Sequence, residues 1–161
     1  MVDLRARDFI SLKDYTREEL EYLMDLASYL KRMQKSGIFN RPLEGKTVAL
    51  IFKKSSTRTR VSFQVAVAQL GGQSFYMTPH VMQLGRGEPV KDTARVLDRY
   101  VYALVIRTFD QGEVLEYAHH MKNPVINGLT NLTHPCQALA DLLTIKEKIG
   151  YLKDIKLVYI G

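Results

Sequence analysis

Residues 47–52, Thr47-Val48-Ala49-Leu50-Ile51-Phe52, are followed directly by residues 53–60, Lys53-Lys54-Ser55-Ser56-Thr57-Arg58-Thr59-Arg60. The first run is short, apolar and rich in β-forming residues, with a turn before it and charge after it. Such a run is typical of a buried parallel strand. The second run holds four cations, four hydroxyls and no acid. Together they predict a strand that leads into the positively charged start of a helix.

Strands and helices alternate along the rest of the chain. A capping box from Thr16 to Glu19 opens a first helix, which Gly37 ends. We expect further helices over residues 57–70, 91–100, 111–121 and 136–149, and further strands over residues 73–77, 103–107 and 124–127. This order predicts an α/β fold, a parallel four-stranded sheet with helices on both faces. Right-handed crossovers place the strand-to-helix loops at one edge, where ligands bind in such folds.

The last residues suggest that the fold continues. Residues 155–160 have the form of a first strand that leads into a glycine turn, with its helix missing. We therefore expect one domain over residues 1–150, followed over residues 151–161 by a linker and the first strand of a fold that is cut short. A C-terminal edge strand is the alternative. An orphan strand exposes an apolar edge, so we also expect self-association or poor solubility.

Composition excludes several classes of protein. The chain has 161 residues, enough for one packed domain, and its single cysteine excludes a disulfide framework or a Cys-based zinc cluster. Neither a secretory signal nor an apolar run of about 20 residues is present. We expect a soluble, cytoplasmic domain that does not contact a membrane. No spacing of His, Asp or Glu suggests a metal, and no cofactor is expected.

The net charge of +6 indicates an anionic partner. Nucleic acid is one candidate, and it predicts strong, salt-dependent duplex binding. However, the basic residues concentrate at one small site, without aromatic interleaving or a recognition motif. We therefore expect no nucleic-acid partner.

Three loops at the predicted ligand edge carry side chains that suit a small anion. The hydroxyls and Arg58 stand at the helix start, Arg107 ends the strand 103–107, and His134 and Gln137 begin the helix 136–149. Each feature alone has a structural alternative: a solvated helix cap, a surface charge or a structural histidine. Their convergence on one edge favours a binding site. Cys136 is not expected to be a nucleophile, because no neighbouring base is evident.

Several motifs resemble, in order and spacing, the amino-terminal half of the ornithine carbamoyltransferases. They are Ser56-Thr57-Arg58-Thr59-Arg60, Gln-Leu-Gly-Arg-Gly-Glu at 83–88, Asp-Thr-Ala-Arg-Val-Leu at 92–97, Arg107, and His-Pro-Cys-Gln-Ala-Leu-Ala-Asp at 134–141. The resemblance covers essentially the whole chain. The first and last motifs are shared with the aspartate carbamoyltransferases, whereas the loop at 83–88 favours the ornithine enzymes.

The resemblance implies a carbamoyl-phosphate-binding domain. The residues that it implies in binding are Ser56, Thr57, Arg58, Thr59, Gln83, Arg107, His134 and Gln137. The first four would hold the phosphate, whereas His134 and Gln137 would contact the carbamoyl group. Gln83 would reach the ligand of a neighbouring subunit, since the family assembles as homotrimers with shared sites.

The resemblance also implies the chemistry. The uncharged δ-amine of L-ornithine attacks the carbamoyl carbon, phosphate leaves, and L-citrulline forms. Arg58, Arg107 and His134 are the implied catalytic residues, acting with Thr59 as a clamp for the developing oxyanion. This is positioning and electrostatic stabilisation, without a covalent enzyme intermediate.

Two positions depart from the family pattern. Lys53 and Gln64 each occupy a position at which the family commonly has Glu. Both changes remove an acid near the phosphate loop. We expect a more positive site with tighter anion binding but no better catalysis, or a differently anchored Arg60.

The family binds its amino acid with a second domain that carries a Ser-Met-Gly loop and a His-Cys-Leu-Pro segment. Neither string occurs in these 161 residues. The resemblance implies that residues 151–161 are a linker and the first strand of that missing ornithine-binding domain. We expect the isolated chain to bind carbamoyl phosphate weakly and not to transfer it. Two alternatives stay open: a non-catalytic carbamoyl-phosphate-binding or assembly module, and a carbamoyltransferase for another amine acceptor such as aspartate.

Overall fold

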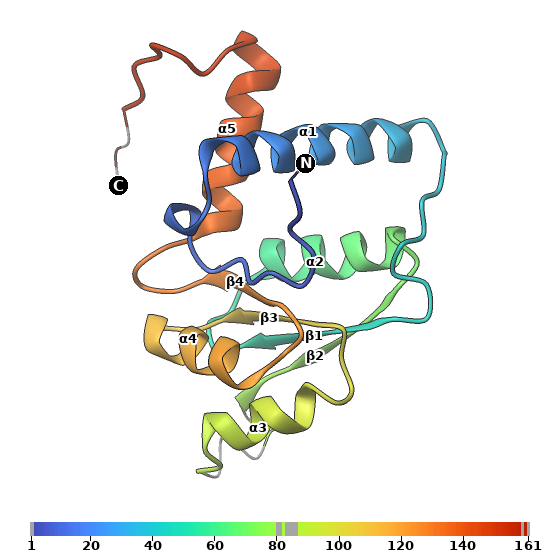
Figure 1. Ribbon diagram of the computed structural model, residues 1–161, viewed down its shortest axis with the longest axis vertical. Helices are drawn as coiled ribbons and strands as arrows, with labels where there is room; N and C mark the ends of the chain where they lie inside the picture. Colours follow the sequence, from blue (N-terminus) through green and yellow to red (C-terminus); the bar gives the residue numbers. More distant parts are fainter. Residues whose placement is uncertain (1, 80–81, 83–86, 159, 161) are drawn as a thin grey trace.

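The computed structural model describes residues 2–79, 82, 87–158 and 160. Its strands are β1 (Thr47–Phe52), β2 (Gln73–Met77), β3 (Ala103–Arg107) and β4 (Val125–Leu129). Its helices are the short 3₁₀ helix η1 (Leu12–Asp14), α1 (Arg17–Lys35), α2 (Thr57–Gln69), α3 (Val90–Leu97), α4 (Gln111–His120) and α5 (Pro135–Ile149). The alternation expected from the sequence is confirmed (Figure 1).

The four strands form one parallel sheet in the order β2-β1-β3-β4. From β1, the chain adds β2 on one side and β3 on the other. The strand order therefore reverses between β1 and β3, which is the place where ligands bind in open α/β sheets. At the carboxyl ends of these two strands, Phe52 pairs with Arg107. The fold thus places the run at 53–60 beside Arg107.

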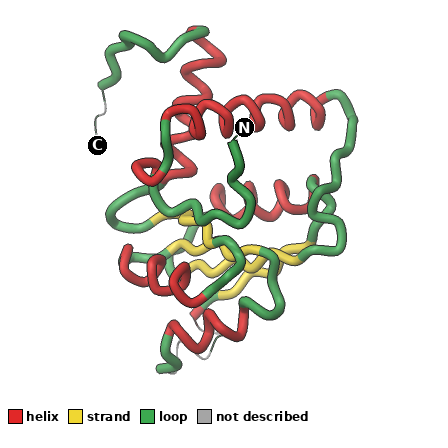
Figure 2. Tube along the Cα trace, viewed as in Figure 1, coloured by secondary structure: helices red, strands yellow, loops and turns green. Residues whose placement is uncertain are grey.

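Helices cover both faces of the sheet, as expected (Figure 2). Side chains alternate along β1, so Ala49 and Ile51 pack with α3 and α4. Leu50 and Phe52 pack on the opposite face, where Val67 of α2 meets them. The strand β1 is buried almost completely, which accounts for its uninterrupted apolar sequence.

Helix α1 lies outside the sheet layers and crosses α5 (Figure 1). The capping box at its start is confirmed: Thr16 Oγ1 accepts from the Glu19 N–H, and Glu19 accepts from the Thr16 N–H at 2.7 Å. Two ion pairs join α1 to α5, Lys31 with Glu147 and Lys146 with Asp25, each at 2.7 Å.

Some boundaries differ from those expected. Helix α3 ends at Leu97 rather than residue 100, because the Asp98 carboxylate accepts from the N–H groups of Lys122 and Asn123 at 2.8 and 2.9 Å. These bonds tie the end of α3 to the loop before β4. Strand β4 runs to Leu129, beyond the expected end at residue 127. The N-terminal segment lies beside it, with Phe9 bridging Ile126 in parallel.

The orphan strand expected over residues 155–160 stays a prediction, because the strands expected to pair with it are not among the described residues. Within the described part, residues 151–158 and 160 form no strand, and the segment leads away from the sheet after α5 (Figure 1). A strand requires a hydrogen-bonded neighbour, and this segment has none among the described residues. Its apolar side chains are exposed, with Val158 78% and Ile160 92% accessible.

Candidate functional site

A cavity of about 500 Å³ lies at the carboxyl ends of β1, β3 and β4, where the starts of α2 and α5 converge. It is lined by Ser56, Arg58, Thr59, Ser62, Phe63, Arg107, Leu129, His134, Cys136, Gln137 and Ala140. No carboxylate belongs to this lining, whereas two guanidinium groups do. The site therefore favours a small, negatively charged ligand.

The start of α2 presents backbone donors to this cavity. Ser56 is the N-cap, in extended conformation, and its hydroxyl accepts from the Thr59 N–H at 3.2 Å. The first turn contains no acid, so no side chain there offsets the positive end of the helix dipole. Helix α5 begins at Pro135, and His134 at its N-cap makes no side-chain cap bond. Two helix N-termini therefore reach one cavity, an arrangement that suits an oxyanion.

Arg107 extends from the end of β3 into the same cavity. Its Nη1 lies 3.5 Å from Thr59 Oγ1, across the boundary between β3 and α2. Its Nε is buried and has no hydrogen-bond partner among the described residues. Burial lowers the pKa of Arg107, but a guanidinium stays protonated in proteins. An unsatisfied buried donor is costly, so this group is prepared for an acceptor that a ligand supplies.

His134 adds a neutral donor. Burial lowers the pKa of its imidazole, and the charge of Arg107 lowers it further, against a smaller opposing effect of Asp141. The imidazole is therefore neutral at pH 7. Its Nδ1 is buried without a hydrogen-bond partner in the described part of the chain. A neutral imidazole beside an arginine can donate to a carbonyl oxygen without adding charge.

Cys136 and Gln137 occupy the first turn of α5. The Cys136 thiol is 3.6 Å from the carbonyl oxygen of Asn127, and burial raises its pKa to about 12. Such a thiol is not a nucleophile at neutral pH, as the sequence indicated. Gln137 Nε2 donates to Asp141 at 2.8 Å, which leaves its amide oxygen available.

The structure brings most of the residues singled out from the sequence into this cavity: Ser56, Arg58, Thr59, Arg107, His134 and Gln137. Thr57 is exposed and instead borders a shallow apolar hollow along α2. Gln83 lies outside the described residues.

Other lining residues were missed. Ser62 and Phe63 follow Thr59 at helical spacing, and Ala140 follows Gln137 in the same way. Their spacing is a signal that the sequence contained. Leu129 could not be found, because it depends on the length of β4.

Lys53, which was expected to make the site more positive, does not line the cavity, and neither does the adjacent Lys54. Lys53 Nζ lies 2.6 Å from Glu113 Oε1 of α4, so its charge is neutralised. Lys54 donates to Asn131 and lies over the Phe109 ring, 4.6 Å from its centroid. The positive potential in the lining therefore comes from Arg58 and Arg107 with the two helix starts.

Arg60 also points elsewhere. Its Nε donates to Gln64 Oε1 at 3.3 Å, and its guanidinium lies 3.9 Å from the centroid of the Tyr76 ring. This cation–π contact and the neutral glutamine replace the helical ion pair that a glutamate would provide.

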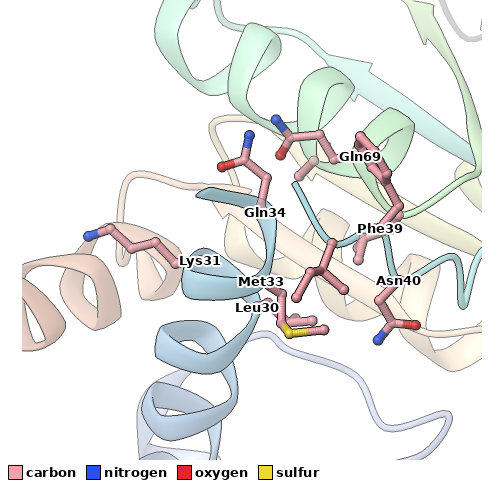
Figure 3. Close-up of a pocket in the computed structure, with 10 residues that line it drawn as sticks. Leu30, Lys31, Met33, Gln34, Phe39, Asn40 and Gln69 are labelled. Carbon is pink, nitrogen blue, oxygen red and sulfur yellow. The ribbon is translucent and has the colours of Figure 1, made fainter. Parts of the chain in front are cut away.

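A second cavity, of about 400 Å³, lies between the end of α1 and α2 (Figure 3). Its lining includes Leu30, Met33 and Phe39, and Lys31 points away towards its ion pair with Glu147. It contains none of the residues singled out for anion binding. Among the described residues, no group of three metal-ligating side chains is found, and no helix is long and apolar enough to cross a membrane.

An α/β domain with a switch-point cavity, two arginines, a neutral histidine and two helix N-termini is a domain built to bind a small oxyanion. Residues 7–147 match the model of the aspartate/ornithine carbamoyltransferase carbamoyl-phosphate-binding domain. The chain therefore belongs to the aspartate/ornithine carbamoyltransferase family.

Individual relatives support this assignment. The chain is 55% identical over 159 residues to an ornithine carbamoyltransferase of Oceanobacillus iheyensis, covering 99% of this chain and 49% of that protein. The ornithine carbamoyltransferase structure from Pyrococcus furiosus matches with a TM-score of 0.90 at 52% identity, over 93% of this chain and 48% of that one.

An aspartate transcarbamoylase from Trypanosoma cruzi, in complex with N-(phosphonacetyl)-L-aspartic acid, matches with a TM-score of 0.86 at 31% identity. That match covers 92% of this chain and 46% of the other. The chain spans about half the length of the curated relatives that it matches.

Proposed function

We propose that this chain is the carbamoyl-phosphate-binding half of an ornithine carbamoyltransferase, which converts carbamoyl phosphate and L-ornithine to L-citrulline and phosphate. The observation that carries the proposal is the carboxylate-free cavity in which Arg58, Arg107 and His134 converge. The identity of about 55% to ornithine carbamoyltransferases supports ornithine as the acceptor. Residues 1–150 form the binding domain, and residues 151–161 lead to the ornithine-binding half.

Different residues of the cavity bind different parts of the ligand. The start of α2 and Arg58 bind the phosphoryl oxygens, where backbone donors and a planar guanidinium complement a dianion. Arg107 and neutral His134 donate to the carbamoyl oxygen as charge develops on it, and Gln137 orients the carbamoyl amide. The protein lowers the barrier by holding donors in place before the reaction, without a bond to the substrate. Loss of one such donor typically raises the barrier by about 3 kcal/mol.

Calorimetric titration with carbamoyl phosphate tests the binding role. A citrulline assay with L-ornithine tests whether this half alone can transfer the carbamoyl group. We expect saturable binding to the 161-residue chain that inorganic phosphate competes away, and no citrulline. Absence of binding contradicts the first part of the proposal. Citrulline formed by this chain alone contradicts the second.

A carbamoyltransferase for aspartate is the second candidate, because the aspartate transcarbamoylase of T. cruzi shares the fold at a TM-score of 0.86. The lower identity of 31% makes it the weaker one. Exchanging L-ornithine for L-aspartate in an enzyme reconstituted with the second half decides between them.

We also propose that the complete protein assembles as a homotrimer. An exposed apolar strip on α2 supports a protein contact there, since Val61 is 50% and Val65 44% accessible beside Arg58. Sedimentation analysis of the complete protein tests this, and a monomer would contradict it. We also propose that its activity lies in cytoplasmic arginine synthesis. In support, a P. furiosus relative that is 52% identical over 161 residues has the name anabolic ornithine carbamoyltransferase.

A further inference from the structure

A carboxylate outside the cavity joins the ends of two neighbouring strands. Glu113 lies in the first turn of α4, and its side chain is only 11% accessible. Its Oε1 lies 2.6 Å from Lys53 Nζ, and its Oε2 accepts from Thr108 Oγ1 at 2.5 Å. Lys53 is the first residue after β1, and Thr108 is the first after β3. One carboxylate therefore connects both strand ends to α4.

Arg107 lies between these attachments. Its carbonyl oxygen accepts from the Lys53 N–H at 2.8 Å, and the adjacent Thr108 N–H donates to Leu129 at 2.9 Å. The guanidinium itself has far weaker support: one 3.5 Å contact with Thr59, and an Nε without a partner among the described residues. The direction of the side chain is therefore set chiefly by its backbone.

The backbone at this point is irregular. The register between β3 and β4 shifts between Ile106 and Arg107. Irregularities of this kind change the direction of a side chain and are frequent beside active sites. An irregular strand end needs fixed neighbours to hold one conformation, and the contacts of Glu113 lie on either side of it.

We propose that Glu113 is a positioning residue for Arg107: through Lys53 and Thr108 it fixes the strand ends that direct the guanidinium into the anion cavity. This inference rests on the proposed function for its binding readout. It also gives Lys53 a role, since a lysine at this position provides the cation that Glu113 binds.

The alternative is that Glu113 acts only through its charge. This alternative predicts the opposite change in anion affinity for Glu113→Lys. If Glu113 only cancelled the charge of Lys53, then Glu113→Lys would make the region more positive and tighten anion binding. If Glu113 positions Arg107, the same substitution weakens anion binding, because two ammonium groups would face each other where an ion pair had been.

The experiment uses the 161-residue chain with Glu113→Gln, Glu113→Lys and the matched control Glu116→Lys. Glu116 is exposed on the same helix, so its substitution repeats the charge change without touching the strand ends. Calorimetry with inorganic phosphate measures affinity. The ¹H–¹⁵N signal of Arg107 Nε–H, assigned by its loss in Arg107→Lys, measures the environment of the guanidinium and its exchange with water.

We expect both Glu113 variants to weaken phosphate binding by roughly tenfold, as misplacement of a binding group does. The Arg107 Nε–H signal should shift and exchange faster in both, whereas Glu116→Lys should leave the signal unchanged and binding equal or tighter. Tighter binding by Glu113→Lys with an unchanged Arg107 signal overturns the proposal. If Glu113→Lys does not fold, the nearly isosteric Glu113→Gln decides by the same two measurements.

Failure of the proposed function gives a different result. If the wild-type chain does not bind phosphate, that function is contradicted. The Arg107 Nε–H signal of Glu113→Gln against wild type still decides the positioning role, since that signal requires no ligand.

Discussion

The guanidinium of Arg107, at the end of β3, and the hydroxyl of Thr59, in the first turn of α2, face each other at 3.5 Å. They are 48 residues apart in the chain and meet because β1 and β3 are neighbours in the sheet. This contact joins the two halves of the cavity, the helix start that suits a phosphoryl group and the strand end that suits a carbonyl oxygen.

Arg107→Lys should weaken phosphate binding although it keeps the charge. A lysine cannot reproduce the planar fork of donors, so we expect a loss of about 2 kcal/mol, or roughly 30-fold in Kd. Calorimetry measures it. The control Arg99→Lys changes an exposed arginine away from the cavity and should bind like the wild type. Equal affinities for all three proteins would refute a role for the guanidinium.

Ser56→Ala should destabilise the domain at the start of α2. The substitution removes the acceptor of the Thr59 N–H, and loss of such a cap costs about 1 kcal/mol in the free energy of unfolding. Urea denaturation measures this change. Ser55→Ala, one residue earlier and outside the helix, is the matched control and should leave the midpoint in place. A midpoint unchanged in Ser56→Ala would argue against the cap.

His134 should make stability depend on pH below neutrality. Its ordinary pKa is 6.5, and the folded protein lowers that pKa. Between the two pKa values the unfolded chain binds more protons than the folded one, so the free energy of unfolding rises with pH there. The share of the free energy of unfolding that comes from neutral His134 is complete above pH 6.5. It is lost as the pH falls towards the pKa of His134 in the folded protein. Denaturation of wild type and His134→Gln over pH 5 to about 7.5 measures it.

The difference in the free energy of unfolding between wild type and His134→Gln should shrink as the pH falls below 6.5. Parallel stability curves over this range would mean that His134 is not held neutral by its surroundings.

Gln64→Glu should change Arg60 without changing the anion cavity. It converts a 3.3 Å hydrogen bond into an ion pair four residues apart, which adds about 0.3 kcal/mol to helix stability. Because Arg60 lies over Tyr76 and does not line the cavity, phosphate affinity should stay within roughly twofold of wild type. Thermal unfolding and calorimetry test the two parts. A large loss of affinity would show that Arg60 reaches the ligand.

The sheet could be predicted because its signals are local. The buried run at β1 reads as a strand by itself, and the polar residues after it mark the helix start. The same local patterns placed Arg107 and His134 at one edge of the sheet. Topology then brings them together, since parallel strands end on the same side.

The partners of charged side chains could not be predicted in this way. Lys53 belongs to the most basic stretch of the sequence, yet its ammonium pairs with Glu113, which is 60 residues further along the chain. Only the packing of α4 against the sheet brings the two together. The strand expected after α5 has the same limit: its apolar pattern is present, but its pairing depends on a neighbouring strand that the described residues do not supply.

We propose above all that carbamoyl phosphate binds between the starts of α2 and α5. Mapping the amide signals of the ¹⁵N-labelled chain during titration with carbamoyl phosphate tests it most directly. We expect saturable shifts centred on Ser56, Thr59, Arg107 and Gln137, and their loss in an Arg58→Gln/Arg107→Gln variant. Shifts centred on Leu30 and Phe39 in the cavity between α1 and α2, or no shifts at all, would contradict it.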